Sequence, residues 1–138
     1  MKKTIIFLLI AVTGFACADK TKLLTESDLM HHRFVLENFN GIQIKVNPAS
    51  SVASSIEFSE DMTVTGVFCN NYRGQASLKD GKLYAEAVST RKFCFDERLT
   101  QAENAFFKAL SEGANTTFSG NLLTISHGGN VFIFRLRD

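Results

Sequence analysis

The 138-residue sequence has no tryptophan, one proline and three cysteines, and neither sign of charge dominates, since 15 basic residues stand against 14 acidic ones. A nearly neutral chain produces no long-range field that would gather phosphate groups, so we expect no nucleic acid partner. Beyond the first 18 residues there is no second long apolar run, so we expect the mature chain to be soluble. Internal repeats and low-complexity tracts are absent, and the length suits one domain.

The sequence also lacks the short motifs of common catalytic and metal sites. G-x-S-x-G, H-E-x-x-H and C-x-x-C are absent, and no glycine-rich phosphate loop precedes a helix. His31 and His32 are adjacent, so on a strand their side chains would point to opposite faces and could not easily share one ion. His127 lies in a glycine-rich turn with no nucleophile placed beside it. We therefore expect no enzyme activity, no metal site and no cofactor.

The first 18 residues have the layout of a secretory signal segment. Two lysines precede the apolar run at residues 5–12, and small residues follow at positions 14, 16 and 18. The run is too short to be a comfortable transmembrane helix. A buried N-terminal strand or helix is the alternative, but a basic start, an apolar centre and a small-residue exit rarely coincide in one. We expect a signal segment at 1–18, a polar lead-in at 19–24 and one domain at 25–138.

Cys69 and Cys94 form an even pair in a chain that is expected to be secreted, which favours a disulfide between them. Closing that loop would stabilise the fold by roughly 3 to 4 kcal/mol. Two buried free thiols are the alternative. A zinc site is the least favoured alternative, because no histidine lies close to either cysteine in the sequence.

Asn40-Gly41 and Asp80-Gly81 predict two β-hairpins, because a type I′ turn requires positive φ at both central residues. Alternating apolar residues and further turn signals predict strands at 32–39, 42–46, 55–59, 62–69, 75–79, 82–88, 116–119, 122–126 and 131–137. We expect one helical turn at 25–31, loops at 47–55 and 70–74, and a segment at 89–95 that extends the sheet or crosses over it. Residues 131–134 are apolar on both faces, which suits a strand enclosed by sheet and helix.

One longer helix is expected to open at Thr100, because Thr100 and Glu103 stand at the spacing of a capping box. Its apolar face comprises Ala102, Phe106, Ala109 and Leu110, and Gly113 ends it in the left-handed conformation. Asp96-Glu97 precede it, where negative charge favours the helix dipole. The predicted fold is therefore mainly β (α+β): a curled antiparallel sheet or small open barrel of about eight short strands, with one amphipathic helix packed on it.

Several segments resemble the META domain family. They are MHHRFVLENFNG at 30–41, GVFCNNYRG at 66–74, STRKFC at 89–94 and the helix that follows. The resemblance runs from about Leu24 to the C-terminal RLRD. It implies a compact β-rich fold with one helix, residence in the bacterial envelope, and an association with heat or envelope stress and with drug tolerance. The resemblance does not imply an enzyme activity, because the family has no agreed one.

The sharpest pieces of the resemblance are Cys69-Asn70 with Gly74, and Thr90-Arg91 with Cys94. A structural interpretation suits them, since glycines permit tight turns or bulges, Asn70 can hydrogen-bond local backbone, and Arg91 can pair with a buried carboxylate or carbonyl. The functional interpretation is a recognition surface formed by Asn70, Gly74, Thr90 and Arg91.

Cys17 is either a lipid attachment point or the middle of the Ala16-Cys17-Ala18 cleavage signal. Gly14 and Phe15 depart from the lipobox of the family's lipoproteins. We favour lipid attachment, because an unpaired cysteine so close to a secretion exit otherwise lacks a purpose. With alanine after the cysteine, sorting would favour the outer membrane, facing the periplasm. Ordinary cleavage would leave a free periplasmic protein.

Three functions follow from these observations. We favour a stress-associated envelope protein that binds another protein or an envelope component, which predicts an exposed apolar or mixed patch on a sheet face and no deep pocket. A carrier of small apolar ligands in a barrel mouth is the alternative, which predicts an enclosed cavity and fails if side chains fill the interior. An enzyme predicts a cleft with a strongly shifted titrating group.

Overall fold

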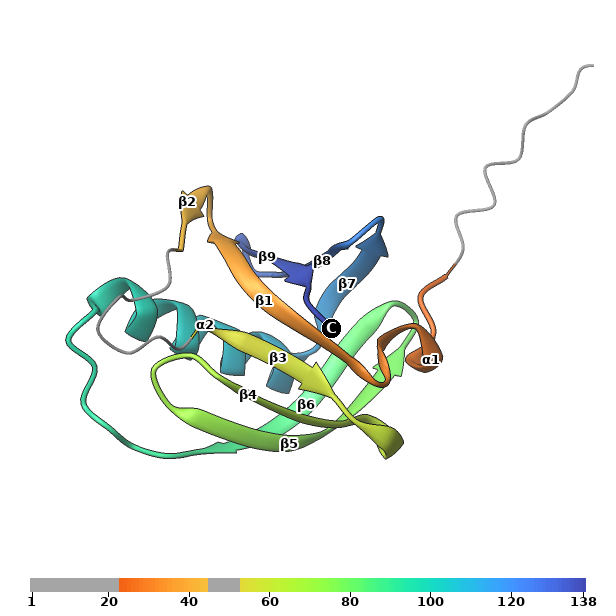
Figure 1. The fold of residues 1–138 in the computed structure, drawn as a ribbon, viewed down its shortest axis with the longest axis horizontal. Helices are drawn as coiled ribbons and strands as arrows, with labels where there is room; N and C mark the ends of the chain where they lie inside the picture. Colours follow the sequence, from red (N-terminus) through yellow and green to blue (C-terminus); the bar gives the residue numbers. More distant parts are fainter. Residues whose placement is uncertain (1–22, 45–52) are drawn as a thin grey trace, which may run out of the picture.

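The computed structural model describes residues 23–44 and 53–138 of the chain. Within these ranges the elements are, in order (Figure 1), α1 Glu26–Leu29, β1 His32–Phe39, β2 Ile42–Gln43, β3 Ser55–Phe58, the 3-10 helix η1 Glu60–Met62, β4 Thr63–Val67, β5 Asn71–Lys79, β6 Lys82–Ser89, α2 Glu97–Glu112, β7 Ala114–Ser119, β8 Leu122–His127 and β9 Asn130–Leu136. The predicted signal segment, Cys17, and most of the predicted lead-in and 47–55 loop lie outside the described residues.

The strands form a closed antiparallel barrel. The order is β1-β3-β4-β5-β6-β7-β8-β9, and β9 pairs with β1, from Phe34 opposite Leu136 to Phe39 opposite Phe132. The short β2 pairs with the end of β1 on the edge that β3 also uses. A register shift at Glu37 marks a β-bulge in β1. The predicted mainly β fold with one amphipathic helix is confirmed, and of its two predicted forms the barrel is the observed one.

The two predicted hairpins have the backbone that their turns require. Asn40 and Gly41 have φ of 51° and 81°, and Asp80 and Gly81 have φ of 51° and 74°. These are the left-handed values of a type I′ turn, which asparagine, aspartate and glycine reach most easily. Both hairpin predictions are confirmed.

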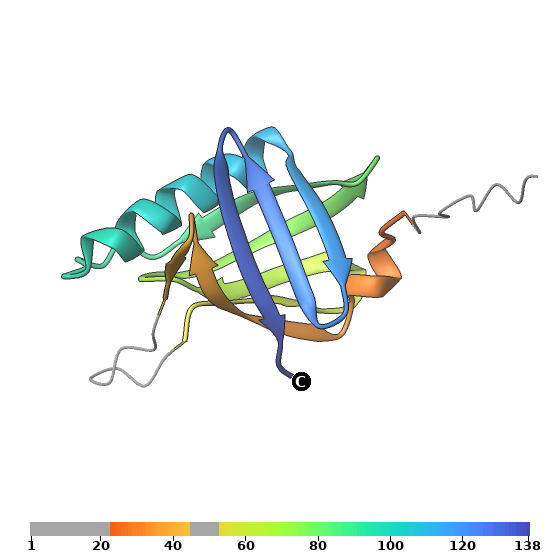
Figure 2. The same ribbon diagram turned by 90° about the horizontal axis from the view of Figure 1, so that it is seen from above.

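The helix α2 fills the place where the barrel wall opens. β6 and β7 pair only through Lys82 with Asn115 and Leu83 with Ala114, and α2 joins these two strands and lies beside β6 (Figure 2). Its predicted apolar face, Ala102, Phe106, Ala109 and Leu110, is completely buried. Gly113 ends the helix, as predicted, but with φ of 96° and ψ of 112° it lies outside the left-handed helical conformation that was expected. A Cβ atom there would lie 2.4 Å from the Tyr84 ring.

Aromatic rings fill the barrel interior. Phe106 of α2 lies between strands, with ring centroids 4.7 Å from Phe68, 5.4 Å from Phe132 and 5.8 Å from Phe134. These four side chains are at most 4% exposed. Each buried phenylalanine contributes about 1.5–3 kcal/mol through loss of apolar surface from water, so this cluster is a substantial part of the core's contribution to stability.

Two predicted segments differ from the structure. Residues 71–74 are part of β5 and not of a loop, because Tyr72 turns into the core while Asn71 and Arg73 take the polar outer face. In β9, Phe132 and Phe134 are buried, but Val131 is exposed and Ile133 only half-buried. The expectation that both faces of residues 131–134 are enclosed is therefore wrong, since the outer face of β9 has no complete cover.

The two ends of the barrel differ in what they carry. At one end lie α1, with Leu29 fully buried, and the turn between β5 and β6, near which Leu23 packs (Figure 1). Thr25 and Asp28 make the capping interaction expected there, since the Asp28 carboxylate accepts from the Thr25 backbone N–H at 2.9 Å. At the opposite end lie residues 90–96 and the start of α2.

Candidate functional site

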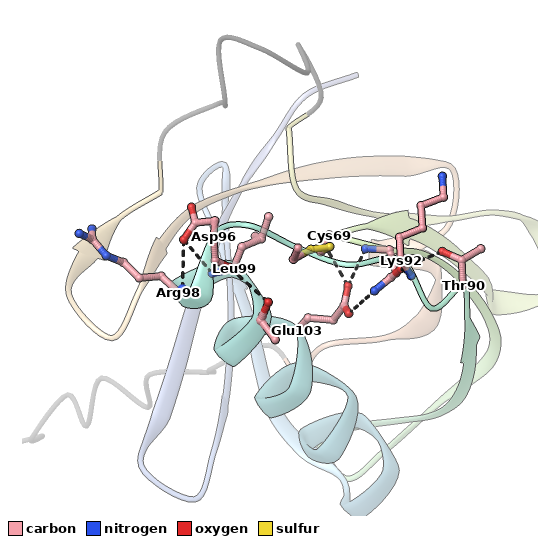
Figure 3. The surroundings of a disulfide bond; sticks show 10 residues. Cys69, Thr90, Lys92, Asp96, Arg98, Leu99 and Glu103 are labelled. Carbon is pink, nitrogen blue, oxygen red and sulfur yellow. Dashed lines mark hydrogen bonds between the residues drawn. A yellow bond between two sulfur atoms is a disulfide. The ribbon is translucent and has the colours of Figure 1, made fainter.

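A buried carboxylate organises the end of the barrel where α2 begins. Glu103, 6% exposed, accepts hydrogen bonds from the backbone N–H groups of Cys69 and Asn70, at 3.1 and 2.7 Å. It also accepts from the Asn70 side-chain amide at 2.8 Å (Figure 3). Three donors that would otherwise be buried and unpaired are thus satisfied by one side chain, and the turn between β4 and β5 is fixed to the helix.

The other side of Asn70 holds the segment that follows β6. Its side-chain oxygen accepts from the Thr90 hydroxyl at 3.1 Å and from the Lys92 backbone N–H at 2.6 Å (Figure 3). The Asn70 amide therefore connects three elements: the β4–β5 turn, α2 through Glu103, and residues 90–92. These are long-range contacts and not the local backbone bonds that we expected of Asn70.

A disulfide between Cys69 and Cys94 ties the same turn to the same segment. The two Cα atoms are 5.9 Å apart, within the usual range for a bridged pair. The segment from Thr90 to Asp96 is thus held near its start by Asn70, near its end by the disulfide, and at Asp96 by the helix that follows.

The helix begins at Glu97 and is capped by Asp96, so the predicted opening at Thr100 is wrong. The Asp96 carboxylate accepts from the backbone N–H groups of Arg98 and Leu99, at 3.0 and 3.4 Å. The Thr100 hydroxyl donates to the Asp96 carbonyl at 3.2 Å, one turn inside the helix. The predicted capping box fails because the Glu103 carboxylate is engaged by the β4–β5 turn.

The braced segment exposes large apolar side chains. Phe93 is 81% exposed, Phe95 is 94% exposed, and Val88, at the end of β6, is 79% exposed. The two phenylalanine rings pack edge to face, with centroids 5.0 Å apart. Phe93 and Phe95 flank Cys94, so the disulfide holds the residue between them against the barrel while both rings lie outside. We call residues 88–98 the aromatic segment.

Basic residues accompany these rings. Arg91 and Lys92 directly precede Phe93, Arg98 follows in the first turn of α2, and all three are exposed. Because Arg91 is exposed, the expectation that it pairs with a buried carboxylate or carbonyl is not met. Of the two acidic residues in the segment, Asp96 is occupied by helix N–H groups, which leaves a mixed aromatic and basic surface.

A buried tyrosine packs next to the site. Tyr72, 3% exposed, donates from its hydroxyl to the Ser55 carbonyl at 2.8 Å. Burial, and to a lesser extent the negative charge of Glu103, raise the pKa of the Tyr72 phenol well above its usual value of 10.0. Gly66 leaves the room for this ring, since a Cβ atom at that position would lie 2.4 Å from the Tyr72 oxygen.

The structure brings together most of the residues singled out in the sequence. Cys69, Asn70, Thr90 and Cys94 contact one another, and Arg91 lies in the same segment. Gly74 lies apart, inside β5, where a Cβ atom would lie 2.6 Å from the Glu86 carbonyl of β6. It permits close packing of two strands and belongs to no turn.

The sequence reasoning missed Glu103, Phe93 and Phe95 as members of this site. Glu103 matched the spacing of a capping box, so its contact with the β4–β5 turn was not expected. For the phenylalanines the available signal was the KFCF sequence itself, which places aromatic residues on both sides of a cysteine expected to be bridged.

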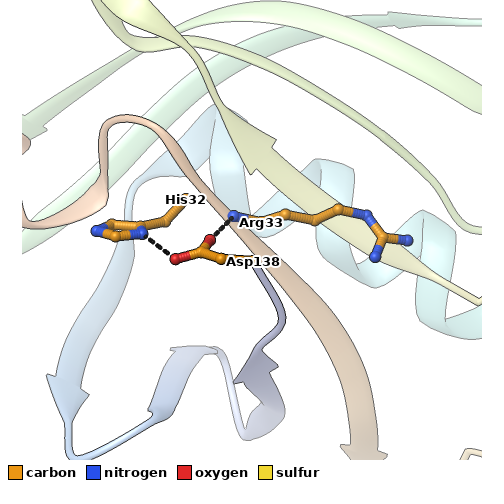
Figure 4. Close-up of polar contacts among 3 residues, drawn as sticks. All are labelled: His32, Arg33 and Asp138. Atoms are coloured by element: carbon orange, nitrogen blue, oxygen red, sulfur yellow. Dashed lines mark hydrogen bonds and ion pairs between the residues drawn. The ribbon is translucent and has the colours of Figure 1, made fainter.

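Two of the histidines have acidic partners away from the aromatic segment. His32 Nδ1 lies 2.8 Å from Asp138 Oδ2, and the Arg33 backbone N–H donates to the same carboxylate (Figure 4). The hydrogen bond from His32 lowers the pKa of the Asp138 carboxyl. His127 Nε2 lies 2.9 Å from Glu112 Oε2. Among the described residues, no cluster of three or more His, Cys, Asp or Glu side chains is arranged to hold a metal ion.

A surface hollow of about 490 Å³ runs along the outer face of β1. Its lining includes Arg33, Val35, Glu37, Ile44, Ala53 and Arg137. The outer residues of β1 alternate with Phe34 and Leu36, which are buried. The hollow is therefore outside the barrel wall and distinct from the filled interior.

The chain was compared with known proteins. The META domain family model matches residues 27–138. The heat shock protein HslJ of Escherichia coli (strain K12) is 31% identical over 140 residues, which cover 100% of this chain and 98% of HslJ. No helix in the described ranges is both long and apolar enough to span a membrane.

Two solved structures are similar. One, determined by NMR, has a TM-score of 0.74 and 31% identity, covering 81% of this chain and 94% of that chain. An NMR structure of a protein from Burkholderia xenovorans has a TM-score of 0.62 and 22% identity, covering 80% and 85% of the two chains. The second likeness bears on the fold alone.

Proposed function

This chain belongs to the META domain family, and from that premise we propose that it is a non-enzymatic, HslJ-like protein of the bacterial envelope that acts by binding. We propose that its binding supports tolerance of heat, envelope stress or drugs. The stress association is supported by the identity of 31% over the whole chain to a heat shock protein.

The observation that carries the proposal is the aromatic segment. Most large apolar side chains of a folded domain lie inside, so two adjacent phenylalanines that are 81% and 94% exposed call for a purpose. The disulfide, the Asn70 hydrogen bonds and the Asp96 cap hold these rings outside. An aromatic surface fixed in advance loses little conformational entropy when it binds, which suits recognition.

We propose a binding and not a catalytic role for the polar residues beside this segment. Both oxygens of the Glu103 carboxylate accept hydrogen bonds from the β4–β5 turn, and the group is buried. A carboxylate engaged in this way is poorly placed to accept a proton from a substrate.

We further propose that Cys17 carries a lipid that anchors the chain in the outer membrane, with the barrel in the periplasm. The intact mass of the mature protein from native membranes tests this. A lipid adduct on an N-terminal Cys17 is the expected result. A chain that starts at Asp19 without an adduct would instead make it a free periplasmic protein.

The alternative of a carrier for small apolar ligands receives little support. The interior positions that such a ligand would occupy are filled by the Phe68, Phe106, Phe132 and Phe134 rings in mutual contact. Displacing them would expose the centre of the core.

The proposed function is tested in a strain that lacks this protein. Survival at elevated temperature and in the presence of an envelope-directed drug is measured after return of the intact chain, of Phe93→Ser/Phe95→Ser, or of Leu23→Ser/Ile42→Ser. The last variant removes two exposed apolar side chains elsewhere on the surface. We expect the phenylalanine variant to fail and the control to restore survival. Full rescue by the phenylalanine variant at equal abundance would refute the assignment of function to this surface.

A further inference from the structure

The aromatic segment is convex and small. Its exposed apolar area, from Phe93, Phe95 and Val88, amounts to roughly 400–500 Å², given the 150–250 Å² that a phenylalanine can bury. A stable interface between two protein chains buries about 800 Å² on each partner. The apolar patch covers only about half of such an area, so a second copy of this chain would have to bury flanking polar surface as well.

A lipid bilayer makes different demands. Its surface deforms around an inserted side chain, so it requires no matching shape, and apolar groups need to enter only about 5–10 Å at the boundary between head groups and acyl chains. The segment of residues 90–96 projects from the barrel (Figure 1), and the two adjacent rings that it exposes meet that demand.

The charges around the rings suit the same surface. Arg91, Lys92 and Arg98 are exposed next to the phenylalanines, and anionic head groups attract such residues. Glu97 opposes this attraction, whereas the Asp96 carboxylate is turned to the helix N–H groups. The local balance favours contact with an anionic membrane over a neutral one.

We propose that Phe93 and Phe95 insert into the surface of an anionic phospholipid bilayer, with Arg91, Lys92 and Arg98 at the level of the head groups. This inference rests on the proposed function, since it names the partner of the same surface. The disulfide and the Asn70 hydrogen bonds hold the rings ready for insertion.

The position of the segment sets an orientation. The described chain starts at residue 23, at the end of the barrel that carries α1, and residues 90–96 lie at the opposite end (Figures 1 and 2). Five residues lie between Cys17 and Leu23, so the chain from one to the other reaches at most roughly 20 Å. The anchor and the rings therefore enter one bilayer only if the barrel lies on its side.

The test uses the mature chain, residues 17–138, with Cys17→Ser so that no lipid contributes. Because the sequence contains no tryptophan, Phe95→Trp introduces a single fluorescent reporter at the proposed contact. We expect its emission to shift to shorter wavelength when vesicles of equal parts phosphatidylglycerol and phosphatidylcholine are added, and to shift less with phosphatidylcholine alone.

Flotation of the same chain with these vesicles gives the affinity. We expect Phe93→Ser/Phe95→Ser to weaken partitioning at least tenfold, on the order expected for two apolar side chains lost from the interface. Arg91→Gln/Lys92→Gln should weaken it on anionic vesicles only, and Leu23→Ser/Ile42→Ser should leave it unchanged. All these side chains are exposed, so circular dichroism should show the folded barrel in each variant.

Three results overturn the bilayer proposal: an unchanged tryptophan spectrum at millimolar lipid, an equal loss in the Leu23/Ile42 control, or a dimer in sedimentation that Phe93→Ser/Phe95→Ser dissociates. If vesicle binding is absent but the phenylalanine variant still fails to restore survival in cells, the bilayer inference falls while the proposed function stands with a protein partner. If vesicle binding is present but that variant restores survival fully, the proposed function of this surface falls.

Discussion

Replacing Glu103 by alanine should cause one of the largest losses of stability available to a single polar substitution in this domain. The change removes the acceptor for the Cys69 N–H, the Asn70 N–H and the Asn70 side-chain amide, at 3.1, 2.7 and 2.8 Å. It leaves all three donors in a place where Glu103 is only 6% exposed. Buried donors without acceptors are costly because they have also lost their bonds to water.

The expected magnitude follows from these contacts. A hydrogen bond to a charged group contributes about 1.5–3 kcal/mol, but three that end on one carboxylate do not add fully. A buried donor left without its acceptor costs about 1–3 kcal/mol, so for these three coupled donors we expect Glu103→Ala to cost about 3–5 kcal/mol in total. This is a large part of the roughly 5–15 kcal/mol that keeps a small domain folded.

Glu112→Ala is the matched control, because Glu112 lies on the same helix with its partner His127 at 2.9 Å but is half exposed. Such a surface pair contributes about 1 kcal/mol or less. Urea unfolding followed by far-ultraviolet circular dichroism measures both variants, since there is no tryptophan to report by fluorescence. If Glu103→Ala does not fold, Glu103→Gln, which keeps one acceptor, should give an intermediate loss.

Equal losses for Glu103→Ala and Glu112→Ala would refute the reasoning. The carboxylate would then contribute no more than a surface group of α2, and the β4–β5 turn would be held by the disulfide and by the Asn70 bonds to Thr90 and Lys92.

Three further predictions concern the same end of the barrel. Cys94→Ser should lower the free energy of unfolding by about 3 kcal/mol in oxidising buffer, and equal stability with and without reductant in the unmodified chain would contradict this. Gly66→Ala should destabilise the fold by roughly 2–3 kcal/mol or more, since the new Cβ would lie 2.1 Å from the Ser55 carbonyl. The control Gly120→Ala, in open space at φ +61°, should cost roughly 1 kcal/mol. Thermal unfolding measures both variants. Because the pKa of Tyr72 is raised in the fold, the folded chain keeps a proton that the unfolded chain releases above about pH 10. The free energy of unfolding is therefore full below that pH and falls above it. Tyr72→Phe should make this alkaline fall shallower in urea titrations across pH, and an unchanged slope would count against the raised pKa.

Local patterns predicted the elements whose formation depends on neighbouring residues. The Asn-Gly and Asp-Gly turns need positive φ wherever they occur, so both hairpins followed from two residues each. The apolar face of α2 followed from helical spacing, because the same four side chains that share a face must be buried together.

Tertiary partners decided the elements that were mispredicted. Glu103 has the right spacing from Thr100 for a capping box, but the helix begins one turn earlier, after Asp96. The Thr100 N–H therefore already bonds the Asp96 carbonyl, and the Glu103 carboxylate accepts from three donors of the β4–β5 turn instead. Asn71 and Arg73 suggest a loop by composition, yet they are the outer residues of a strand whose inner residue is Tyr72. No pattern within a short window contains these contacts.

The exposed rings of Phe93 and Phe95 show the same limit of short sequence patterns. Apolar residues are normally expected inside, and KFCF alone does not say on which side its phenylalanines lie. Cys94 determines the side on which the rings lie, because its bond to Cys69 turns the middle of the segment inward. That bond joins residues that are 25 positions apart. An exposed apolar patch was therefore expected on a sheet face and is found on a connecting segment.

The pairing of β1 with β9 has a consequence for the order in which the protein can be made. Phe34 pairs with Leu136, so the first and last strands of the barrel meet only after nearly the whole chain is available. Contacts so distant in sequence slow folding, and until they form, β1 presents an unpaired edge that invites association with other chains. A chain that leaves the cytoplasm from its N-terminus would thus stay open during passage and close only once β9 has emerged. For a chain exported in this way, the most vulnerable period would lie between export and closure, when a rise in temperature would be most harmful.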